Sequence, residues 1–327
     1  MPQITLHPSE HEFESEPGES ILAAAERVGI RLPFECKDGS CGMCAAKLVA
    51  GSVDQRRAKP FGLTPQMRAE GYVLTCVAIP QEDVVLDLPL QVPFTEARAT
   101  VVAKNRQTHD TIELVLQLPP EGHFEYEAGQ YAQLTIPDTP VSRAYSMAAP
   151  FREDGRLSFF IRKVPDGQMT GYIFDVLEEG MALDVCGPMG SFGLVPDSER
   201  PMLMVAGGSG MAPIQALLMA LFTQNDPRPT LFYYGARTQA DLYRLDWLND
   251  MATVHSNFEF VPVLSHEPED SGWGGRRGFV TDAVLEDQPD LTPFEAYLCG
   301  PPPMIEAAVA GFSAQGLDAE RIRFDAF

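Results

Sequence analysis

Residues 201–221 read PMLMVAGGSGMAPIQALLMAL and carry the clearest structural signal in the chain. The run Met202–Ala206 is apolar and of strand length, and Pro213 lies where a helix can begin. The glycines that permit a tight turn between them are Gly207, Gly208 and Gly210. The stretch therefore predicts strand, loop and helix, and its glycines argue that the charge-free residues 201–222 are not a membrane span.

The strand and helix signals alternate from this loop toward the C-terminus. The segments that follow are TLFYYGAR (230–237), FEFVPVLS (258–265) and AYLCGPPPMIEAAVAGF (296–312). This alternation predicts a doubly wound parallel sheet, an α/β domain, over residues 198–327.

The loop reads G-x-G-x-x-P rather than the G-x-G-x-x-G/A of the dinucleotide fingerprint, so by itself it is a weak sign of nucleotide binding. The end of the second strand, where NAD-binding domains usually carry an acid, reads GAR. Arg237 there either accepts a 2′-phosphate or is merely solvated, and Asp241 is a candidate to approach a ribose. The residues leave NADH and NADPH both open.

The middle of the chain is rich in predicted strands. Alternating runs at 99–119 and 129–137, with proline and glycine turns, predict an antiparallel β-barrel over residues 97–197. A helix is expected over GYIFDVL, residues 171–177. Residues 89–99, PLQVPFTEARA, carry two prolines and little pattern, and we expect them to form a linker.

Four of the six cysteines fall in the first quarter of the chain. They are Cys36, Cys41 and Cys44 in CKDGSCGMC, and Cys76 in VLTCVA. This is the plant-type 2Fe–2S spacing, and Gly39 and Gly42 would let the loop wrap closely around a cluster. The alternatives are a tetrahedral zinc site, which usually needs a second Cys-x-x-Cys pair, and unrelated core thiols.

The residues around these cysteines predict a small α+β domain. Residues 4–20 read as two short strands and a turn, and Ser20 is a candidate cap for the apolar-faced helix ILAAAERVG. Strands around one helix predict a β-grasp domain over residues 1–92.

Composition limits the classes of function. The 327 residues suggest two domains, or three small ones, and 45% apolar with 21% charged residues excludes disorder for the whole chain. The net charge of −22 makes nucleic acid and anionic membrane surfaces poor partners. The first ten residues lack a charged n-region and an apolar h-region, so we expect a cytoplasmic protein.

Residues 1–90 resemble a plant-type ferredoxin domain, because the complete cysteine set is in place. The remainder resembles the ferredoxin-NADP reductase family. That family's R-x-Y-S signature matches RAYS at 143–146, and a G-x-x-T segment follows at 167–170. GGSGMAP at 207–213 and CGPPPM at 299–304 match its G-G-x-G-x-A-P and C-G-P-P motifs.

The resemblance implies a flavin site. Arg143 would pair with the FAD pyrophosphate, Tyr145 would lie on the isoalloxazine ring, and Ser146 would hydrogen-bond near N5. The residues that would bring amides and a hydroxyl to the pyrophosphate are Gly167, Met169 and Thr170.

The resemblance also implies a nicotinamide site. The glycine loop of Gly207, Gly208 and Gly210 would face the nucleotide, and Cys299 would lie by the nicotinamide ring. Phe327 would stack on the flavin, although phenylalanine replaces the tyrosine of the plant enzymes, and Phe324 is a second possibility. For Cys186 a buried core position is preferred.

The order of the three parts resembles the reductase component of multicomponent oxygenases, with the phenol hydroxylase reductase type closest. That family implies hydride transfer from NADH to FAD, then single electrons through the 2Fe–2S cluster to an oxygenase component or an intermediate acceptor. We expect a monomer with a transient partner contact and no catalytic triad, because hydride transfer needs alignment above all.

Two alternatives stay open at this point. In the first, the same relay serves a deoxysugar dehydrase, a haem monooxygenase or a Rieske dioxygenase. In the second, the chain is a redox-sensing flavo-iron–sulfur subunit without turnover of its own.

Overall fold

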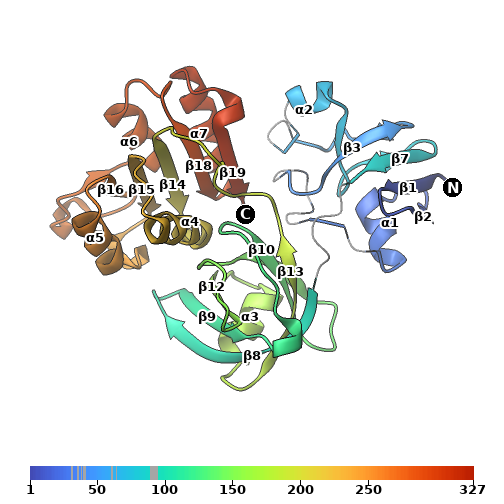
Figure 1. The fold of residues 1–327 in the computed structure, drawn as a ribbon, viewed down its shortest axis with the longest axis horizontal. Coiled ribbons are helices and arrows are strands. Elements are labelled where there is room, and N and C mark those ends of the chain that lie inside the picture. The colour runs from blue at the N-terminus through green and yellow to red at the C-terminus, as the bar shows by residue number, and fades with distance from the viewer. Residues whose placement is uncertain are drawn as a thin grey trace. The chain divides into compact units, whose positions relative to one another are not determined.

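The computed structural model describes residues 1–30, 32–34, 37, 39, 42–59, 62–63, 65–88 and 95–327, without the side chains of residues 65 and 66. Contacts divide the chain into two compact units, one of residues 1–93 together with Phe327 and one of residues 94–326. Each unit is described by itself, and Figure 1 shows the elements of both.

The first unit contains a five-stranded mixed sheet in the order β2-β1-β7-β3-β5. These strands are β1 (Gln3–His7), β2 (His11–Glu14), β3 (Ala45–Ala50), β5 (Tyr72–Leu74) and β7 (Val84–Asp87). The smaller elements are the strand pair β4 (Val53–Asp54) and β6 (Ile79–Pro80), with helices α1 (Ile21–Arg27) and α2 (Pro65–Ala69). Helix α1 starts as predicted, because the Ser20 hydroxyl accepts the N–H of Ala23 at 3.3 Å. Its buried residues cover the sheet, which confirms the β-grasp prediction.

The second unit begins with a six-stranded antiparallel sheet in the order β11-β10-β13-β8-β9-β12. These strands are β8 (Thr95–Arg106), β9 (Thr111–Gln117), β10 (Tyr131–Thr135), β11 (Ser142–Ser146), β12 (Arg156–Arg162) and β13 (Ala182–Met189), with helix α3 (Gln168–Asp175). A bridge between Met147 and Phe159 brings the two edges together, so the sheet nearly closes into the predicted barrel. Two details of the prediction are wrong. Residues 95–99 belong to β8 rather than to a linker, and α3 begins at Gln168 rather than Gly171. Residues 89–94 lie outside the described part.

A six-stranded parallel sheet completes the second unit, in the order β17-β16-β15-β14-β18-β19. Its strands are β14 (Met202–Gly207), β15 (Thr230–Ala236), β16 (Phe258–Leu264), β17 (Arg276–Arg277), β18 (Glu295–Gly300) and β19 (Ile322–Ala326). Its helices are α4 (Met211–Gln224), α5 (Leu245–Val254), α6 (Val280–Asp287) and α7 (Pro302–Ala314). The 3₁₀ turns of this unit are η1 (Pro120–Gly122), η2 (Gly208–Gly210), η3 (Gln239–Asp241), η4 (Glu269–Ser271) and η5 (Ala319–Arg321).

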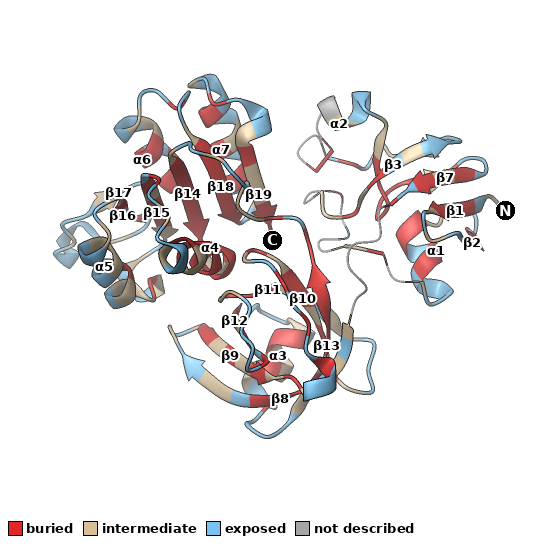
Figure 2. Cartoon of the chain, in the orientation of Figure 1, coloured by how far each residue is buried: buried red, intermediate tan, exposed pale blue. Residues whose placement is uncertain are grey.

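Burial explains why residues 201–222 carry no charge, because they contain strand β14 and most of the largely buried helix α4. Every residue of β14 and of β18 is buried, as the red strands of Figure 2 show, because helices cover both faces of a parallel sheet. Helix α4 also packs on β12 of the barrel, where Gln215 donates to the Ala148 carbonyl at 2.8 Å. Within the described residues, no helix is long and apolar enough to cross a membrane.

Candidate functional site

The glycine loop lies where the strand order of the parallel sheet reverses. Strand β14 pairs with β15 on one side and with β18 on the other, and such switch points open a crevice at the carboxyl ends of the strands. Here η2 lies directly against the end of β18. A Cβ on Gly210 would lie 2.1 Å from the Cys299 carbonyl oxygen, so only glycine fits without a backbone shift.

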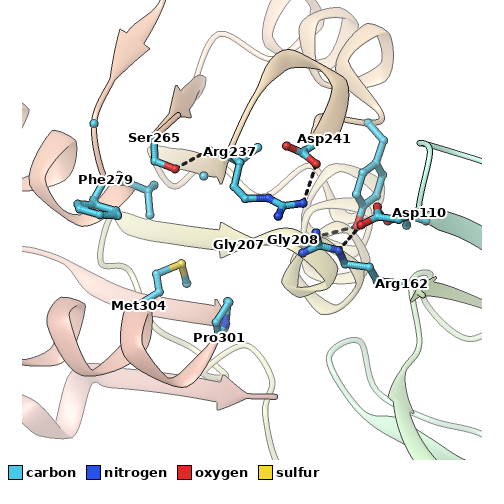
Figure 3. Close-up of a pocket in the computed structure, with 16 residues that line it drawn as sticks. Asp110, Arg162, Gly207, Gly208, Arg237, Asp241, Ser265, Phe279, Pro301 and Met304 are labelled. Carbon is cyan, nitrogen blue, oxygen red and sulfur yellow. Dashed lines mark hydrogen bonds and ion pairs between the residues drawn. The ribbon is translucent and has the colours of Figure 1, made fainter. Parts of the chain in front are cut away.

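A cavity of about 240 Å³ opens at this crevice. Figure 3 shows its labelled walls, which come from the glycine loop, from the segments after β15 and β16, from helix α7 and from the barrel. The labelled residues are Asp110, Arg162, Gly207, Gly208, Arg237, Asp241, Ser265, Phe279, Pro301 and Met304. The predicted residues of the nucleotide loop and of the β15 end therefore line one cavity.

Two ion pairs line this cavity. Arg237 Nη2 lies 3.2 Å from Asp241 Oδ1, and Asp241 Oδ2 accepts both the N–H and the hydroxyl of Thr238 at 2.9 Å. Arg162 Nε of the barrel donates to Asp110 Oδ2 at 2.7 Å. Burial raises the pKa of both carboxyls, but their hydrogen bonds and the arginine charges outweigh burial and hold each pKa below its ordinary value. Both carboxyls are therefore anionic at neutral pH.

Ser146 and Cys299 were predicted from separate motifs, and the structure connects them through Asp325. The Ser146 hydroxyl, at the end of β11, donates to Asp325 Oδ2 at 3.4 Å. Asp325 lies opposite Cys299 in the β18–β19 ladder and is 1% exposed. A barrel strand and the end of the parallel sheet thus meet at one buried point.

The two candidate aromatic residues near the C-terminus differ in position. Phe327 directly follows β19 and is 36% exposed. Phe324 precedes Asp325 in the strand, so its side chain points to the opposite face of the sheet from Asp325. Strand alternation therefore argues against Phe324 as the flavin-stacking residue.

The remaining flavin candidates lie on the barrel. Arg143 is exposed on β11, and its Nη1 donates to the Ser142 carbonyl at 2.6 Å, whereas Tyr145 on the same strand is half-buried. Burial raises the pKa of the Tyr145 hydroxyl well above its ordinary value, so this side chain is neutral.

The other candidates, Gly167, Met169 and Thr170, occupy the cap and first turn of α3, where backbone N–H groups have no partner within the helix. A Cβ on Gly167 would lie 2.5 Å from the Thr170 hydroxyl oxygen. That hydroxyl accepts the Val164 N–H at 3.2 Å, so it holds the loop before the helix. The amides rather than the hydroxyl are thus the groups available to an anion.

In the first unit, Cys44 and Cys76 lie together. Their sulfur atoms are 3.2 Å apart although 32 positions separate them in the sequence, and both residues are buried and outside any disulfide. The fold thus brings two thiols to one place, as shared ligation of a metal ion requires. Gly42 has φ +79°, and a Cβ there would lie 3.1 Å from the Gly62 carbonyl oxygen. Glycine therefore lets the backbone at residue 42 pass close to Gly62, as expected of a loop that wraps around a cluster. Cys36 and Cys41 lie outside the described residues.

Three domain families match the chain in the predicted order. They are the 2Fe-2S iron-sulfur cluster binding domain at residues 4–81, the oxidoreductase FAD-binding domain at 98–193 and the oxidoreductase NAD-binding domain at 204–310. These matches confirm the predicted cofactors, FAD, a 2Fe–2S cluster and a nicotinamide nucleotide, and favour the cluster over zinc. They also confirm that the chain is an oxidoreductase.

Relatives match over nearly the whole chain. The xylene/toluene monooxygenase electron transfer component XylA of Pseudomonas putida is 37% identical and covers 97% of this chain and 91% of its own length. The reductase component DmpP of phenol 2-monooxygenase from Pseudomonas sp. is 34% identical, covering 94% of this chain and 88% of its own length. The cytochrome P450 reductase GcoB of Amycolatopsis, a solved structure, is 34% identical, with a TM-score of 0.77 and coverage of 100% and 99%.

Sequence reasoning missed three polar residues of the site. Asp110 and Arg162 lie 52 positions apart in the sequence, and Asp325 and Ser146 lie 179 positions apart, so no local pattern predicts either contact. One signal was available for Asp325, because a carboxylate in the terminal strand RFDAF must be paired if the strand is buried.

Proposed function

The chain belongs to the family of reductases that unite 2Fe–2S, FAD-binding and NAD-binding domains, and we propose that it carries electrons from NADH through FAD and the cluster to an oxygenase component. The observation that carries this proposal is the meeting of Ser146, Asp325 and Cys299 at one buried point. Hydride transfer needs the donor and acceptor rings held face to face, and these residues join the two parts that would hold them.

The proposed roles at the reaction centre follow from this geometry. FAD supplies the chemistry, since it accepts two electrons together and releases them singly. Ser146, fixed by Asp325, would orient the flavin edge, and Cys299, against which the glycine loop of Gly210 packs, would lie beside the nicotinamide ring. Phe327 would cover the flavin in the absence of the nicotinamide.

The flavin phosphates are proposed to lie between β11 and α3. Arg143 is exposed and, among the described residues, its guanidinium donates to the Ser142 carbonyl, so its remaining N–H groups are available to a diphosphate. The first-turn amides at Met169 and Thr170 supply a second set of donors, and Gly167 lets the loop before α3 pack closely on the Thr170 hydroxyl. Tyr145 presents a neutral ring to the isoalloxazine.

NADH is proposed as the donor over NADPH. The cavity's two arginines, Arg162 and Arg237, are each already neutralised by a carboxylate. A 2′-phosphate near them would meet the anionic carboxyls of Asp110 and Asp241, whereas ribose hydroxyls can donate hydrogen bonds to a carboxylate. Gly207 and Gly208 line the cavity and would lie against the bound nucleotide.

The cluster ligands are proposed to be Cys36, Cys41, Cys44 and Cys76, the set named by the spacing. The three domains are proposed as residues 1–92, 97–197 and 198–327. We further propose a cytoplasmic monomer that meets its oxygenase component transiently, since electron-transfer contacts are small. The printed names of XylA and DmpP favour a monooxygenase acceptor, and GcoB keeps a haem acceptor as the second candidate.

An anaerobic visible-spectrum titration tests the relay. Stepwise addition of NADH should bleach both a flavin and an iron–sulfur absorption band. NADPH should need at least about tenfold higher concentration to bleach the same bands. Absence of any bleaching by either nucleotide refutes the relay, and equal bleaching refutes the choice of donor. Adding purified monooxygenase or P450 partners to the reduced protein and following reoxidation then decides the acceptor.

A further inference from the structure

The segment at residues 190–201 joins the barrel to the parallel sheet and contains no helix or strand. Its start is fixed to the barrel, where Gln130 Nε2 donates to the Gly190 carbonyl at 3.0 Å. A Cβ on Gly129 would lie 2.4 Å from the Phe192 carbonyl oxygen, so the two backbones touch. The Phe192 ring then meets the edge of Tyr297 on β18, with ring centres 6.1 Å apart.

A buried polar network in β18 holds the rest of this segment. The Tyr297 hydroxyl accepts the Val195 N–H at 3.1 Å and donates to Glu295 Oε1 at 2.9 Å. Glu295 Oε2 accepts the Ser198 hydroxyl at 2.9 Å, and Arg228 Nη1 donates to Oε1 at 3.0 Å. Glu295 is 3% exposed, so these hydrogen-bond partners are needed to offset the cost of burying a carboxyl group.

The outer side of the same segment is open. A cavity of about 580 Å³ lies there, lined by residues 194–198 together with Tyr126, Phe151 and Arg228. Within this segment Leu194 packs against the hydrophobic core, and two hydrogen bonds from within hold Val195 and Ser198, one to Tyr297 and one to Glu295.

Tyr297 also stands next to the proposed nicotinamide position. Side chains two apart in a strand lie on one face, so Glu295, Tyr297 and Cys299 follow one another along the same face of β18. At the far end of this row Cys299 lies opposite Asp325, which holds Ser146 of the barrel. The barrel and the sheet are thus connected at both ends of one strand.

We propose that Tyr297 is a positioning residue for hydride transfer, which fixes the joining segment and thereby sets the distance between Cys299 and the flavin-binding strand β11. The proposal rests on the proposed function above. The joining segment holds one end of β18 and the Ser146–Asp325 contact holds the other, so looseness at the segment would shift the strand where the two rings must align.

Tyr297→Phe is the sharpest test, because it removes one oxygen and keeps the ring against Phe192. Glu295 keeps Arg228 and Ser198 as partners, so no buried charge is orphaned and the fold should survive. Tyr233→Phe is the matched control. Tyr233 is similarly buried in strand β15, which β14 separates from β18, and its hydroxyl also donates to a carboxylate, Asp287 Oδ2, at 3.3 Å.

Two readouts are needed on the holoprotein. A misplacement of 1 Å lowers rates by about 100-fold, so a smaller loosening should slow stopped-flow flavin reduction by NADH about tenfold, with KM unchanged within about twofold. Hydrogen exchange, read by mass spectrometry, should quicken in the peptide that contains Val195. Ser198→Ala should shift both readouts in the same direction by less, and Tyr233→Phe should shift neither.

The outcomes separate this inference from the function beneath it. Wild-type protein that NADH does not reduce refutes both. Wild-type protein that NADH reduces rapidly, with Tyr297→Phe equally fast, leaves the function standing and overturns the positioning role. A slow Tyr297→Phe accompanied by an equally slow Tyr233→Phe also overturns it, because the effect would then belong to tyrosine hydroxyls in general.

Discussion

The contact between Gly210 and Cys299 gives the strongest quantitative expectation. In Gly210→Ala the new Cβ would start 2.1 Å from the Cys299 carbonyl oxygen and 2.9 Å from the Gly300 nitrogen. Ordinary contact begins at about 3.4 Å, so the loop and the end of β18 must separate by about 1.3 Å, the difference between 3.4 and 2.1 Å. Backbone atoms cannot turn aside as a flexible side chain does, so the strain must move β18 or the loop.

The expected result is a folded but slow enzyme. Overpacking of this kind costs about 1–3 kcal/mol of stability, which a domain tolerates, whereas a displacement above 1 Å at the proposed nicotinamide position lowers hydride transfer by about 100-fold. The assay is NADH-dependent ferricyanide reduction, with thermal unfolding measured on the same sample.

Gly274→Ala is the control, because a Cβ there meets nothing within 4 Å and its φ is not in the left-handed range. The control should match wild type in both rate and unfolding midpoint. Ferricyanide reduction by Gly210→Ala within twofold of wild type would refute the reasoning, since the loop would then be remote from the reacting rings.

Three further outcomes are expected. Cys76→Ser should abolish cytochrome c reduction yet preserve NADH-to-ferricyanide activity, since the flavin half lies in the other compact unit; equal loss of both contradicts this division. Arg143→Ala should weaken FAD retention by roughly 10- to 150-fold, the loss of about 1.5–3 kcal/mol from a charged hydrogen bond, and unchanged flavin content removes Arg143 from the site. Asp110→Asn should unfold more easily than wild type at pH 7. The fold lowers the pKa of Asp110 from 3.8, so the pair with Arg162 stabilises the fold fully above pH 3.8. The difference in stability between wild type and Asp110→Asn should therefore vanish as the pH falls through the lowered pKa. A difference in stability that does not change with pH speaks against the ion pair.

Local patterns predicted the elements whose signal lies within a few residues. The strand at Met202–Ala206 could be predicted because a fully buried strand is continuously apolar, and the glycine turn and helix follow it directly. Ser20 was legible as a cap because its hydroxyl bonds three residues ahead. These interactions depend on residues that are close together in the sequence.

The errors arose where a strand or helix lacks an apolar pattern of its own. Residues 95–99 read TEARA, and only small side chains, Thr95, Ala97 and Ala99, alternate there with the exposed Glu96 and Arg98, so the start of β8 resembled a linker. Helix α3 begins in DGQMT, where a cap glycine and polar residues hide its first turn. The start of β8 is decided by pairing with the distant strand β13, and α3 by packing of Met169 and Ile173 in the barrel core, rather than by local preference.

The contacts that join the barrel to the parallel sheet could not be predicted by pattern, because each links residues far apart. Ser146 and Asp325 are 179 positions apart, and Val195 and Tyr297 are 102 apart. The motifs nevertheless named one partner of the first contact, since Ser146 belongs to RAYS. The partner that fixes it, Asp325, belongs to no motif.

Strand β18 shows which physical rule would recover such residues. Its sequence EAYLCG places a carboxylate in a strand whose every residue is buried, and a buried carboxylate is stable only when it is paired and hydrogen-bonded. A search for those partners leads from Glu295 to Tyr297, Ser198 and Arg228, and so to the joining segment. Charged residues in otherwise apolar strands are therefore guides to how the parts of the chain are held together, which the nucleotide motifs do not reveal.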